Sequence, residues 1–309
     1  QVCFSVASRN EAGHNLIMLS YQHIYHAGNM ADVQKHLWLL TVLEYLGRKD
    51  KPYIWIDTHA GRGAYDLSAP EAAKLAEYKS GIAAVLEKVK GAEHPVLKLY
   101  YGKILELNTQ NVIARSGSDE AIHGLPQSLR SLAMTSDNLG IYPGSSLLAA
   151  QMLRSGDRLF SFDLHPKEFE FLRQNLKPYK GADARKEDGY GALKSLVPPQ
   201  IRRGGVLIDP SYEIKDEYGQ VARAVQDAVK KWPQGVYMIW YPILNAGRHA
   251  ALCAALADIA QSAGVDFTRD EWMFEGAERG MLGSGMAIVN TPYSCGDTMA
   301  AIKNVIDSV

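Results

Sequence analysis

The sequence predicts an α/β protein with a mostly parallel β-sheet that is covered by helices on both faces. Three observations lead to this expectation. Short apolar runs alternate with helical patterns along most of the chain, which is typical of strand-helix-strand units. Two of the strand-like runs, at 53–57 and 205–208, are short and apolar, as buried parallel strands are. A closing pair of β-like runs, at 266–274 and 285–290, indicates an antiparallel edge.

The chain before the first strand contains a leader, a polar-aromatic segment and a helix. Residues 1–17 are poorly patterned and the chain from Met18 onward looks like a natural start, so we expect the leader to be disordered or upstream sequence. A helix is predicted over 31–46, with Asn29 as its cap and Gly47 as its stop.

Two polar residues of this helix, Lys35 and His36, lie beside its apolar stripe and near its start. They face either a functional site or the solvent. The pattern leaves both alternatives open.

The first strand is predicted at 53–57, and the glycine-containing loop 58–65 follows its carboxyl end. In open α/β sheets, cofactors bind at loops in this position. The loop lacks the Gly-x-Gly-x-x-Gly dinucleotide fingerprint, so an ordinary turn is an equal alternative.

We divide the chain into four parts. After the leader, residues 18–67 hold the amino-terminal motif and the first strand-helix unit, and residues 139–309 hold the remainder of the main domain. Between them, residues 68–138 are charge-rich and helical, with the clearest helix at 71–90, and we expect a small helical insertion subdomain there.

The elements of the last part are predicted from the same patterns. They are helices at 145–154, from Pro166 onward and at 248–263, and strands at 158–164, 182–186, 205–209 and 235–241.

The composition limits the class of protein. With 309 residues, of which 47% are hydrophobic, the chain can bury one large core, or one core and a small satellite. No apolar stretch approaches the roughly 18 residues of a spanning helix and no classical signal peptide leads the chain, so we expect a cytoplasmic protein with no membrane partner. Cys3, Cys253 and Cys295 lack disulfide or zinc spacing. A net charge of −1 excludes a positively charged coat but allows a local basic patch.

The most informative motif is Asp209-Pro210-Ser211-Tyr212, which follows the apolar run at 205–208. It differs at one position from Asp-Pro-Pro-Tyr, the signature of enzymes that methylate exocyclic amino groups of nucleic-acid bases. The lone pair of such an amine is delocalised into the ring, so a catalyst gains by accepting hydrogen bonds from both N–H groups. Asp209 and the carbonyl of Pro210 would be these acceptors, and Tyr212 would stack on the base. An ordinary strand-ending turn also produces Asp-Pro.

Three further residues end other predicted strands and are suited to a nucleoside-bearing ligand. His59 and its loop would contact the amino-acid end of S-adenosylmethionine, Asp163 would accept hydrogen bonds from the ribose hydroxyls, and Asp188 would accept from the adenine amine. The carboxyl ends of parallel strands share one edge, so these groups would meet Asp209. Taken singly, each aspartate is as readily a helix cap and His59 a turn histidine.

With these motifs in place, the chain resembles the RlmJ-type adenine-N6 methyltransferases of bacterial 23S ribosomal RNA, over about Met18 to Pro292. The resemblance rests on motifs that occur in family order: Met18-Leu19-Ser20-Tyr21-Gln22-His23, His26-Ala27-Gly28-Asn29, Ala31-Asp32-Val33, Lys35-His36, Asp57-Thr58-His59-Ala60-Gly61, Tyr142-Pro143-Gly144-Ser145, Leu164-His165-Pro166, Asp188-Gly189, Ile208-Asp209-Pro210 and Trp240-Tyr241-Pro242. Some members are similar to proteins described as involved in catabolism of external DNA.

The resemblance implies a Rossmann-like methyltransferase that uses S-adenosylmethionine and no metal. The partner would be 23S ribosomal RNA, either free of protein or in an early assembly precursor. The implied cofactor contacts are His36, His59, Ser145, Asp163, Asp188, Gly189 and Asp209. The implied catalytic residues are Asp209, Pro210 and Tyr212, and the implied substrate contacts are Tyr21, His23, Lys35 and Tyr212.

Two positions depart from the family pattern. Ser211 stands where the family has a second proline, which loosens the turn and adds a hydroxyl beside the base. Asp163 stands where a glutamate is usual, which shortens the reach of the carboxylate to the ribose. Neither change removes an acceptor.

Other functions are compatible with these residues. DNA adenine is one alternative substrate, which would link the protein to the use of external DNA. A non-catalytic nucleic-acid-binding protein on a methyltransferase fold is another, suggested by Ser211 and the near-zero net charge. A nuclease is less favoured, because the sequence has no recognisable cluster of metal-binding carboxylates and histidines.

Overall fold

A computed structural model describes residues 22–116, 139–277 and 280–307. Its main feature is a seven-stranded sheet in the order β5-β4-β1-β6-β7-β9-β8. The strands are β1 (Ile54–Asp57), β4 (Arg158–Phe162), β5 (Ala182–Arg185), β6 (Gly204–Ile208), β7 (Val236–Leu244), β8 (Phe267–Met273) and β9 (Met281–Val289).

The first five of these strands run parallel, and β9 pairs antiparallel with both β7 and β8. The predicted α/β class, the mostly parallel sheet and the antiparallel edge are therefore confirmed. The chain winds outward in one direction through β4 and β5 and in the other through β6 and β7. The order reverses between β1 and β6, and the crevice at such a switch point is where open sheets bind their ligands.

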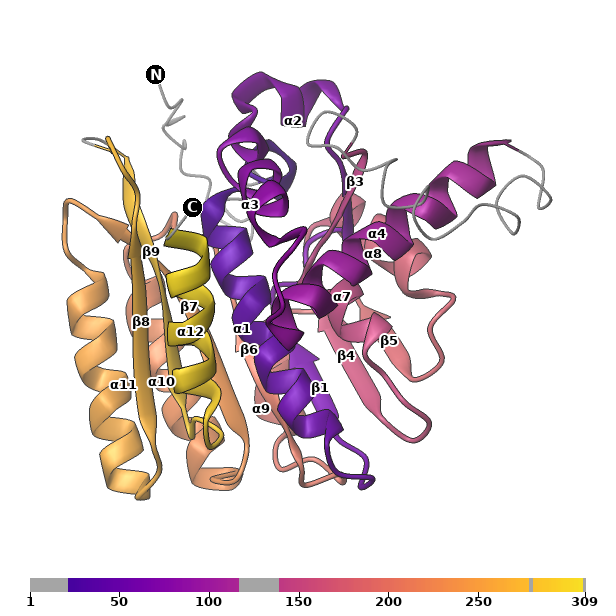
Figure 1. Cartoon of the computed structure of the whole chain (residues 1–309). Coiled ribbons are helices and arrows are strands. Elements are labelled where there is room, and N and C mark those ends of the chain that lie inside the picture. The colour runs from indigo at the N-terminus through magenta and orange to yellow at the C-terminus, as the bar shows by residue number, and fades with distance from the viewer. Residues whose placement is uncertain (1–21, 117–138, 278–279, 308–309) are drawn as a thin grey trace, which may run out of the picture.

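Helices cover both faces of the sheet (Figure 1). One face carries α1 (Met30–Gly47), α7 (Ser145–Gln151), α8 (Pro166–Leu176) and α12 (Cys295–Asp307), and the other carries α9 (Gly189–Leu196), α10 (Glu217–Lys231) and α11 (His249–Ala263). Each face has its own apolar cluster, one around Trp38 and Trp55 and the other around Val206 and Leu256. The sheet therefore separates two cores, and its carboxyl edge stays available for a site.

Helix α1 is buried on nearly all sides, because α4, α7, α12 and β9 pack around it. Its start is as predicted, since the side chain of Asn29 accepts a hydrogen bond from the main-chain N–H of Asp32. The alternative of a solvated first turn is wrong. Lys35 and His36 are only 5% and 1% exposed, so both polar side chains point into the protein.

The helical segment after β1 differs from the prediction. It contains α2 (Pro70–Leu75), the 3₁₀ turn η3 (Glu77–Lys79), α3 (Ile82–Val89) and α4 (Pro95–Ser116). The single helix predicted at 71–90 is wrong, because Ala76 adopts a left-handed φ of 50° and the chain turns again at Gly81. A Cβ on Gly81 would lie 2.2 Å from the carbonyl oxygen of Gly28, so the second break is fixed by close packing.

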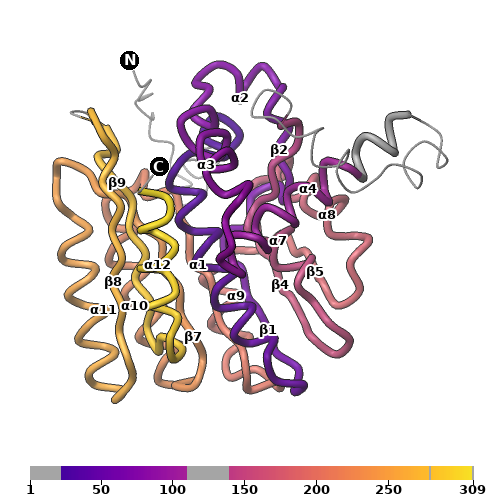
Figure 2. Tube along the Cα trace, in the orientation of Figure 1, coloured from indigo at the N-terminus to yellow at the C-terminus, as the bar shows by residue number. Residues whose placement is uncertain are grey.

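These helices lie at the amino-terminal end of α1, as Figure 2 shows. Side chains of α3 and α4 belong to the same apolar cluster as α1. The part of the proposed insertion subdomain that the structure describes thus shares a core with the main domain. The boundaries 68–138 stay a prediction.

Several elements have no counterpart in the prediction. Strands β2 (Ala64–Asp66) and β3 (Ile141–Pro143) form a small antiparallel pair that brackets the helical segment, and α12 covers the sheet beside α1. Each strand of the pair has three residues, too few for a periodic signal. In the parts of the chain that the structure describes, no helix is both long and apolar enough to cross a membrane.

Candidate active site

The strands β1, β4, β5 and β6 end side by side at the carboxyl edge of the sheet, and an aspartate lies at or just after each end. They are Asp57, Asp163, Asp188 and Asp209. The alignment of strand ends predicted from the sequence is therefore present. Because β1 and β6 are direct neighbours, Asp209 lies across the switch point from the β1 loop.

A chain of ion pairs joins Asp209 to the first turns of α1. The Lys35 ammonium donates to Asp209 Oδ2 at 2.6 Å and lies 2.8 Å from Asp32 Oδ1. The Nε2 of His23 lies 2.8 Å from Asp32 Oδ2. Three of the predicted site residues, namely His23, Lys35 and Asp209, are therefore connected through Asp32, which was assigned no role from the sequence.

The charges of these ion-paired side chains stabilise one another. Burial alone would lower the pKa of Lys35, but Asp209 and Asp32 together raise it well above its usual range. Burial would likewise raise the pKa of Asp32, yet the charges of His23 and Lys35 hold it well below its ordinary value. Lys35 therefore stays charged at neutral pH, and it holds the Asp209 carboxylate in one orientation.

The Asp209 carboxylate keeps one oxygen uncommitted. Among the described residues its only hydrogen-bond donor is Lys35, which takes Oδ2. The side chain is 13% exposed, so it is reached by solvent although the lysine beside it is buried. The arrangement leaves an acceptor at the end of β6 that is available to an amine.

Tyr212 occupies a packed position after this motif. Its hydroxyl donates to the carbonyl of Trp240 at 2.7 Å, and its ring lies 4.4 Å from that of Tyr218 between ring centroids. Its φ is 53°, a left-handed conformation that is costly for a residue with a Cβ. The residue is 7% exposed, so stacking of a base on Tyr212 stays a prediction and would require the ring to turn outward.

On the other side of the switch point, Asp163 accepts hydrogen bonds from two main-chain N–H groups, those of Gly61 at 3.0 Å and His165 at 2.7 Å. Burial raises the pKa of Asp163 to about 7. The carboxylate joins the β1 loop to the start of α8. It lies where a ribose would be bound in this class of sheet.

Asp188 caps helix α9 by accepting from the N–H groups of Tyr190 at 3.4 Å and Gly191 at 2.9 Å. The helix-cap alternative is thus present in the structure, and a contact to the cofactor stays a prediction. A Cβ on Gly189 would lie 2.0 Å from the carbonyl oxygen of Thr58. A glycine is therefore required where α9 meets the β1 loop.

Several polar atoms around the β1 loop are buried without a protein partner. His59 Nδ1 pairs with Thr58 Oγ1 at 2.8 Å, while its Nε2 has no partner among the described residues, and burial lowers its pKa to about 4. Asp57 Oδ2 accepts from Ser145 at 2.6 Å and Ser146 at 2.8 Å, while its Oδ1 has no partner in the part of the chain that the structure describes. Unpartnered buried polar atoms are costly in a folded protein and are expected where a polar ligand binds.

His36 completes this group. Its Nδ1 lies 2.7 Å from the hydroxyl of Tyr142, and its Nε2 is buried with no partner among the residues that the structure describes. Burial lowers the pKa of His36 to about 3, so the ring is neutral at physiological pH. The unpartnered atoms of His36, His59 and Asp57, together with the Asp163 carboxylate, fit a ligand that carries both an amino-acid end and a ribose.

The sequence interpretation missed Asp32 and Asp57. Each lies inside a motif quoted above, and this position was the available signal of a role in the site. A carboxylate that is buried with its neighbours needs polar partners. Tyr21, predicted to contact the substrate, lies outside the described residues. The described ranges contain no group of three or more His, Cys, Asp or Glu side chains that could hold a metal ion.

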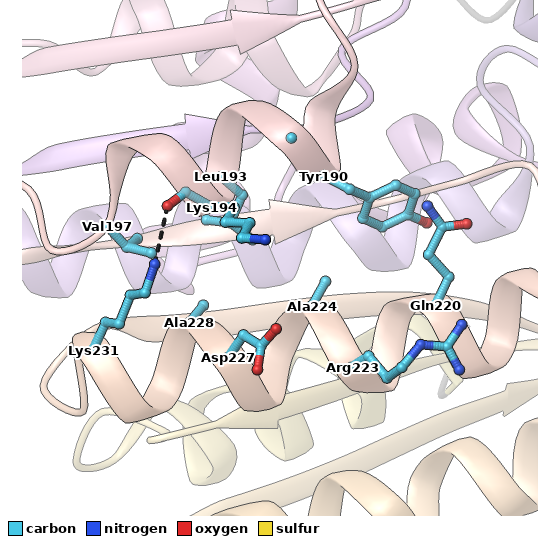
Figure 3. Close-up of a pocket in the computed structure, with 11 residues that line it drawn as sticks. Tyr190, Leu193, Lys194, Val197, Gln220, Arg223, Ala224, Asp227, Ala228 and Lys231 are labelled. Carbon is cyan, nitrogen blue, oxygen red and sulfur yellow. Dashed lines mark hydrogen bonds between the residues drawn. The ribbon is translucent and has the colours of Figure 1, made fainter.

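A separate groove of about 230 Å³ lies between α9 and α10 (Figure 3). Lys194, Arg223, Asp227 and Lys231 line it together with Tyr190, whose ring also packs against His59 at 4.9 Å between centroids. The groove shares Tyr190 and Gly191 with the edge described above.

This chain is similar to proteins of a known family. A family model described as "Ribosomal RNA large subunit methyltransferase D, RlmJ" matches residues 50–121 and 110–309. Two relatives named "Ribosomal RNA large subunit methyltransferase J" are 34% identical in Haemophilus influenzae and 33% identical in Escherichia coli. The first alignment covers 92% of each chain, and the second covers 89% of this chain and 88% of its relative.

A solved structure is similar over nearly the whole chain. The crystal structure of protein LPL1258 from Legionella pneumophila has a TM-score of 0.74 and 32% identity, and the match covers 91% of this chain and 94% of that one. The family match over most of the sequence and the two relatives above 30% identity show that this chain belongs to the RlmJ family of ribosomal RNA large subunit methyltransferases.

Proposed function

We propose that the protein transfers a methyl group from S-adenosylmethionine to the N6 amine of an adenine in 23S ribosomal RNA. The observation that carries this proposal is the Asp209 carboxylate, which ends β6 at the switch point and has one oxygen fixed by Lys35. Membership of the RlmJ family supports ribosomal RNA as the substrate.

Asp209 and Pro210 orient the amine. Asp209 accepts a hydrogen bond from one N–H of the adenine amine through its uncommitted oxygen, and the carbonyl of Pro210 accepts from the other. These two bonds hold the nitrogen lone pair toward the methyl donor and out of conjugation with the ring. Positioning of this kind and exclusion of water supply most of the rate enhancement, because a sulfonium is already an activated leaving group. No strong general base is needed, because the nitrogen becomes acidic only as it gains the methyl group, and its proton then passes to solvent.

The cofactor supplies an activated methyl group on a sulfonium. Asp163 accepts from the ribose hydroxyls, and Asp188 and Gly189 approach its adenine. His36, His59 and Ser145 lie toward the amino-acid end. The unpartnered Nε2 atoms of the two histidines support this assignment, since each gains a partner when the ligand is bound.

His23 and Lys35 form the substrate side, together with Tyr21 and Tyr212. Lys35 occupies one edge of the Asp209 carboxylate, so it limits the directions from which an amine approaches. The ion pairs through Asp32 connect this position to the segment just before α1. Binding of RNA against that segment would therefore change the orientation of the Asp209 carboxylate.

The RNA is either protein-free or part of an early assembly precursor, because the target base must leave its stack to reach Asp209. We propose that the protein acts in the cytoplasm. DNA is the less favoured polymer, since the relatives are named for ribosomal RNA.

The test is transfer of labelled methyl from S-adenosylmethionine to deproteinised 23S ribosomal RNA from cells that lack the protein, with DNA assayed in parallel. We expect label in RNA. Label in DNA alone would move the activity to the DNA substrate, and no label in either polymer, with no cofactor binding, would favour the non-catalytic binding protein.

A further inference from the structure

Tyr142 lies in one of the motifs that carry the family resemblance, Tyr142-Pro143-Gly144-Ser145, yet the proposed function gives it no role. Its hydroxyl is the middle member of a buried chain of three groups. It lies 2.7 Å from His36 Nδ1 and 2.8 Å from the hydroxyl of Tyr100. Tyr100 and Tyr142 are fully buried and His36 is 1% exposed.

The three members come from three separate elements. His36 is on α1, Tyr142 is on β3 and Tyr100 is on α4. Neither hydroxyl has another hydrogen-bond partner among the described residues, and Nε2 of His36 has none. The chain therefore has two hydrogen bonds, and the protons that fill them can be counted.

Only one order of protons satisfies both tyrosines. Tyr100 donates to the oxygen of Tyr142, Tyr142 donates to Nδ1 of His36, and the ring proton of the neutral histidine resides on Nε2. If the ring proton were on Nδ1, a tyrosine hydroxyl proton would be left buried without an acceptor. Without a ligand, each order leaves one buried donor with no acceptor among the described residues, Nε2–H in the first order and a tyrosine hydroxyl in the second. Once an acceptor oxygen of a ligand lies at Nε2, only the first order satisfies every donor, and it is then favoured by about tenfold or more.

Burial lowers the pKa of His36 to about 3, which excludes the doubly protonated ring at neutral pH. The Nε2–H is then a neutral donor, held in place by the chain and without a protein acceptor among the described residues. A donor of this kind suits an acceptor oxygen on a ligand, and the carboxylate of the amino-acid end is the strongest acceptor on S-adenosylmethionine.

We propose that Tyr142 is a positioning residue that fixes the Nε2–H tautomer of His36, so that this histidine donates to the carboxylate of the cofactor. Tyr100, on α4, donates the last hydrogen bond of the group, to the hydroxyl of Tyr142. This bond connects the helical segment after β1 to the proposed cofactor site. The cofactor part of this inference rests on the proposed function. The tautomer part rests on the two hydrogen bonds among the protein groups and on a ligand acceptor at Nε2.

The test begins with the protein saturated with S-adenosylmethionine, labelled with ¹⁵N-histidine and studied by long-range ¹H–¹⁵N NMR. We expect Nε2 of His36 to carry the proton in the wild type and in Tyr100→Phe, where Tyr142 can still donate to Nδ1. In Tyr142→Phe the ring loses its donor, and we expect a mixture of tautomers. A proton on Nδ1 in the wild type, or an unchanged tautomer in Tyr142→Phe, would overturn the proposal.

The second measurement is the affinity for S-adenosylmethionine, by titration calorimetry. We expect Tyr142→Phe to bind about tenfold more weakly. Tyr101→Phe is the matched control, because Tyr101 follows Tyr100 in the sequence and its hydroxyl lies outside the hydrogen-bonded group. The affinity of this variant for S-adenosylmethionine should equal that of the wild type. Equal affinities for Tyr142→Phe and the wild type would overturn the cofactor part.

The two proposals fail differently. A wild type that has the Nε2–H tautomer and binds S-adenosylmethionine, but methylates neither RNA nor DNA, would contradict the proposed function while the role of Tyr142 is upheld. If Tyr142→Phe does not fold, the wild-type tautomer and its comparison with Tyr100→Phe still decide the proton order.

Discussion

The two sides of the switch point are held by different kinds of interaction. On the β4 and β5 side, Asp163 and Asp188 accept hydrogen bonds from main-chain N–H groups of the loops and helix starts around them. On the β6 side, Asp209 is held by Lys35, which is 174 residues away in the sequence and on a different layer of the fold. The proposed cofactor side is thus held by main-chain N–H groups, whereas the proposed catalytic side is held by buried charges that folding brings together.

This difference suggests a division of labour. A carboxylate that is fixed by the backbone offers a constant surface to the cofactor. A carboxylate that is fixed by a lysine shares its orientation with the segment before α1, through Asp32 and His23. Changes on the first side should alter cofactor affinity, and changes on the second side should alter transfer or the stability of the fold.

The largest effect is expected for Asp209→Ala. We expect transfer to fall by more than about 10³-fold, because an oriented acceptor for the amine is lost, while cofactor affinity stays within about threefold. Rates under single turnover and calorimetric titration check the two parts. Asp216→Ala, an exposed change in the same loop, is the control. Retained transfer would contradict the role of Asp209.

The second prediction concerns the ion pairs behind Asp209. Asp32→Asn leaves the buried Lys35 with one partner fewer, so we expect the free energy of unfolding to fall by about 3–5 kcal/mol. Denaturant unfolding measures this. The double variant with Lys35→Met should recover part of the loss, because it also removes the buried cation. A loss below about 1 kcal/mol in Asp32→Asn would show that the ion pairs do not hold this side together.

The third prediction concerns the cofactor side. Asp163→Asn should weaken binding of S-adenosylmethionine by about 10- to 100-fold, since hydrogen bonds to a carboxylate are lost, and leave the rate at saturating cofactor nearly unchanged. Asp183→Asn, on the neighbouring strand, is the control. A lower rate of transfer at saturating cofactor, with unchanged affinity for S-adenosylmethionine, would contradict the proposed role of Asp163 in cofactor binding.

The same residue should give binding a pH dependence. The pKa of Asp163 is raised to about 7 in the free protein, and the ribose hydroxyls donate to the ionised form. Binding therefore favours loss of the proton, and affinity should fall as the pH drops below 7, by about tenfold per pH unit at most. In Asp163→Asn this dependence should disappear.

The smallest effect is expected at Glu217, at the start of α10, whose pKa is raised to about 7 by burial and whose Oε2 has no partner among the described residues. Because a raised carboxyl pKa means that the folded state prefers the proton, stability should decline as the pH rises from about 4.5 to 7. Glu217→Gln should flatten this decline and be about 1–3 kcal/mol more stable at pH 8. Thermal unfolding from pH 4 to pH 8 is the measurement, with the exposed Glu187→Gln as control.

The sequence predicted the cofactor side better than the catalytic side, for a physical reason. Asp163 and Asp188 each lie near the end of a predicted strand, and the carboxyl ends of parallel strands must meet at one edge. Their position thus follows from local pattern. The partners of Lys35 could not be predicted in this way, because no periodicity in α1 indicates a carboxylate on β6.

The errors in the fold have similar causes. The helix predicted at 71–90 is broken where Ala76 takes a left-handed conformation and where Gly81 packs on Gly28, and neither contact is visible in helical periodicity. The apolar stripe of α1 predicts one buried face, whereas α4, α12 and β9 bury the others. Tertiary packing decided both cases.

The most direct test of the account is mass spectrometry of the nucleosides from 23S ribosomal RNA after incubation with the protein and S-adenosylmethionine. The account predicts N6-methyladenosine from the wild type and none from Asp209→Ala. A methyl group on another nucleoside or another atom, or equal N6-methyladenosine from the two proteins, would contradict it.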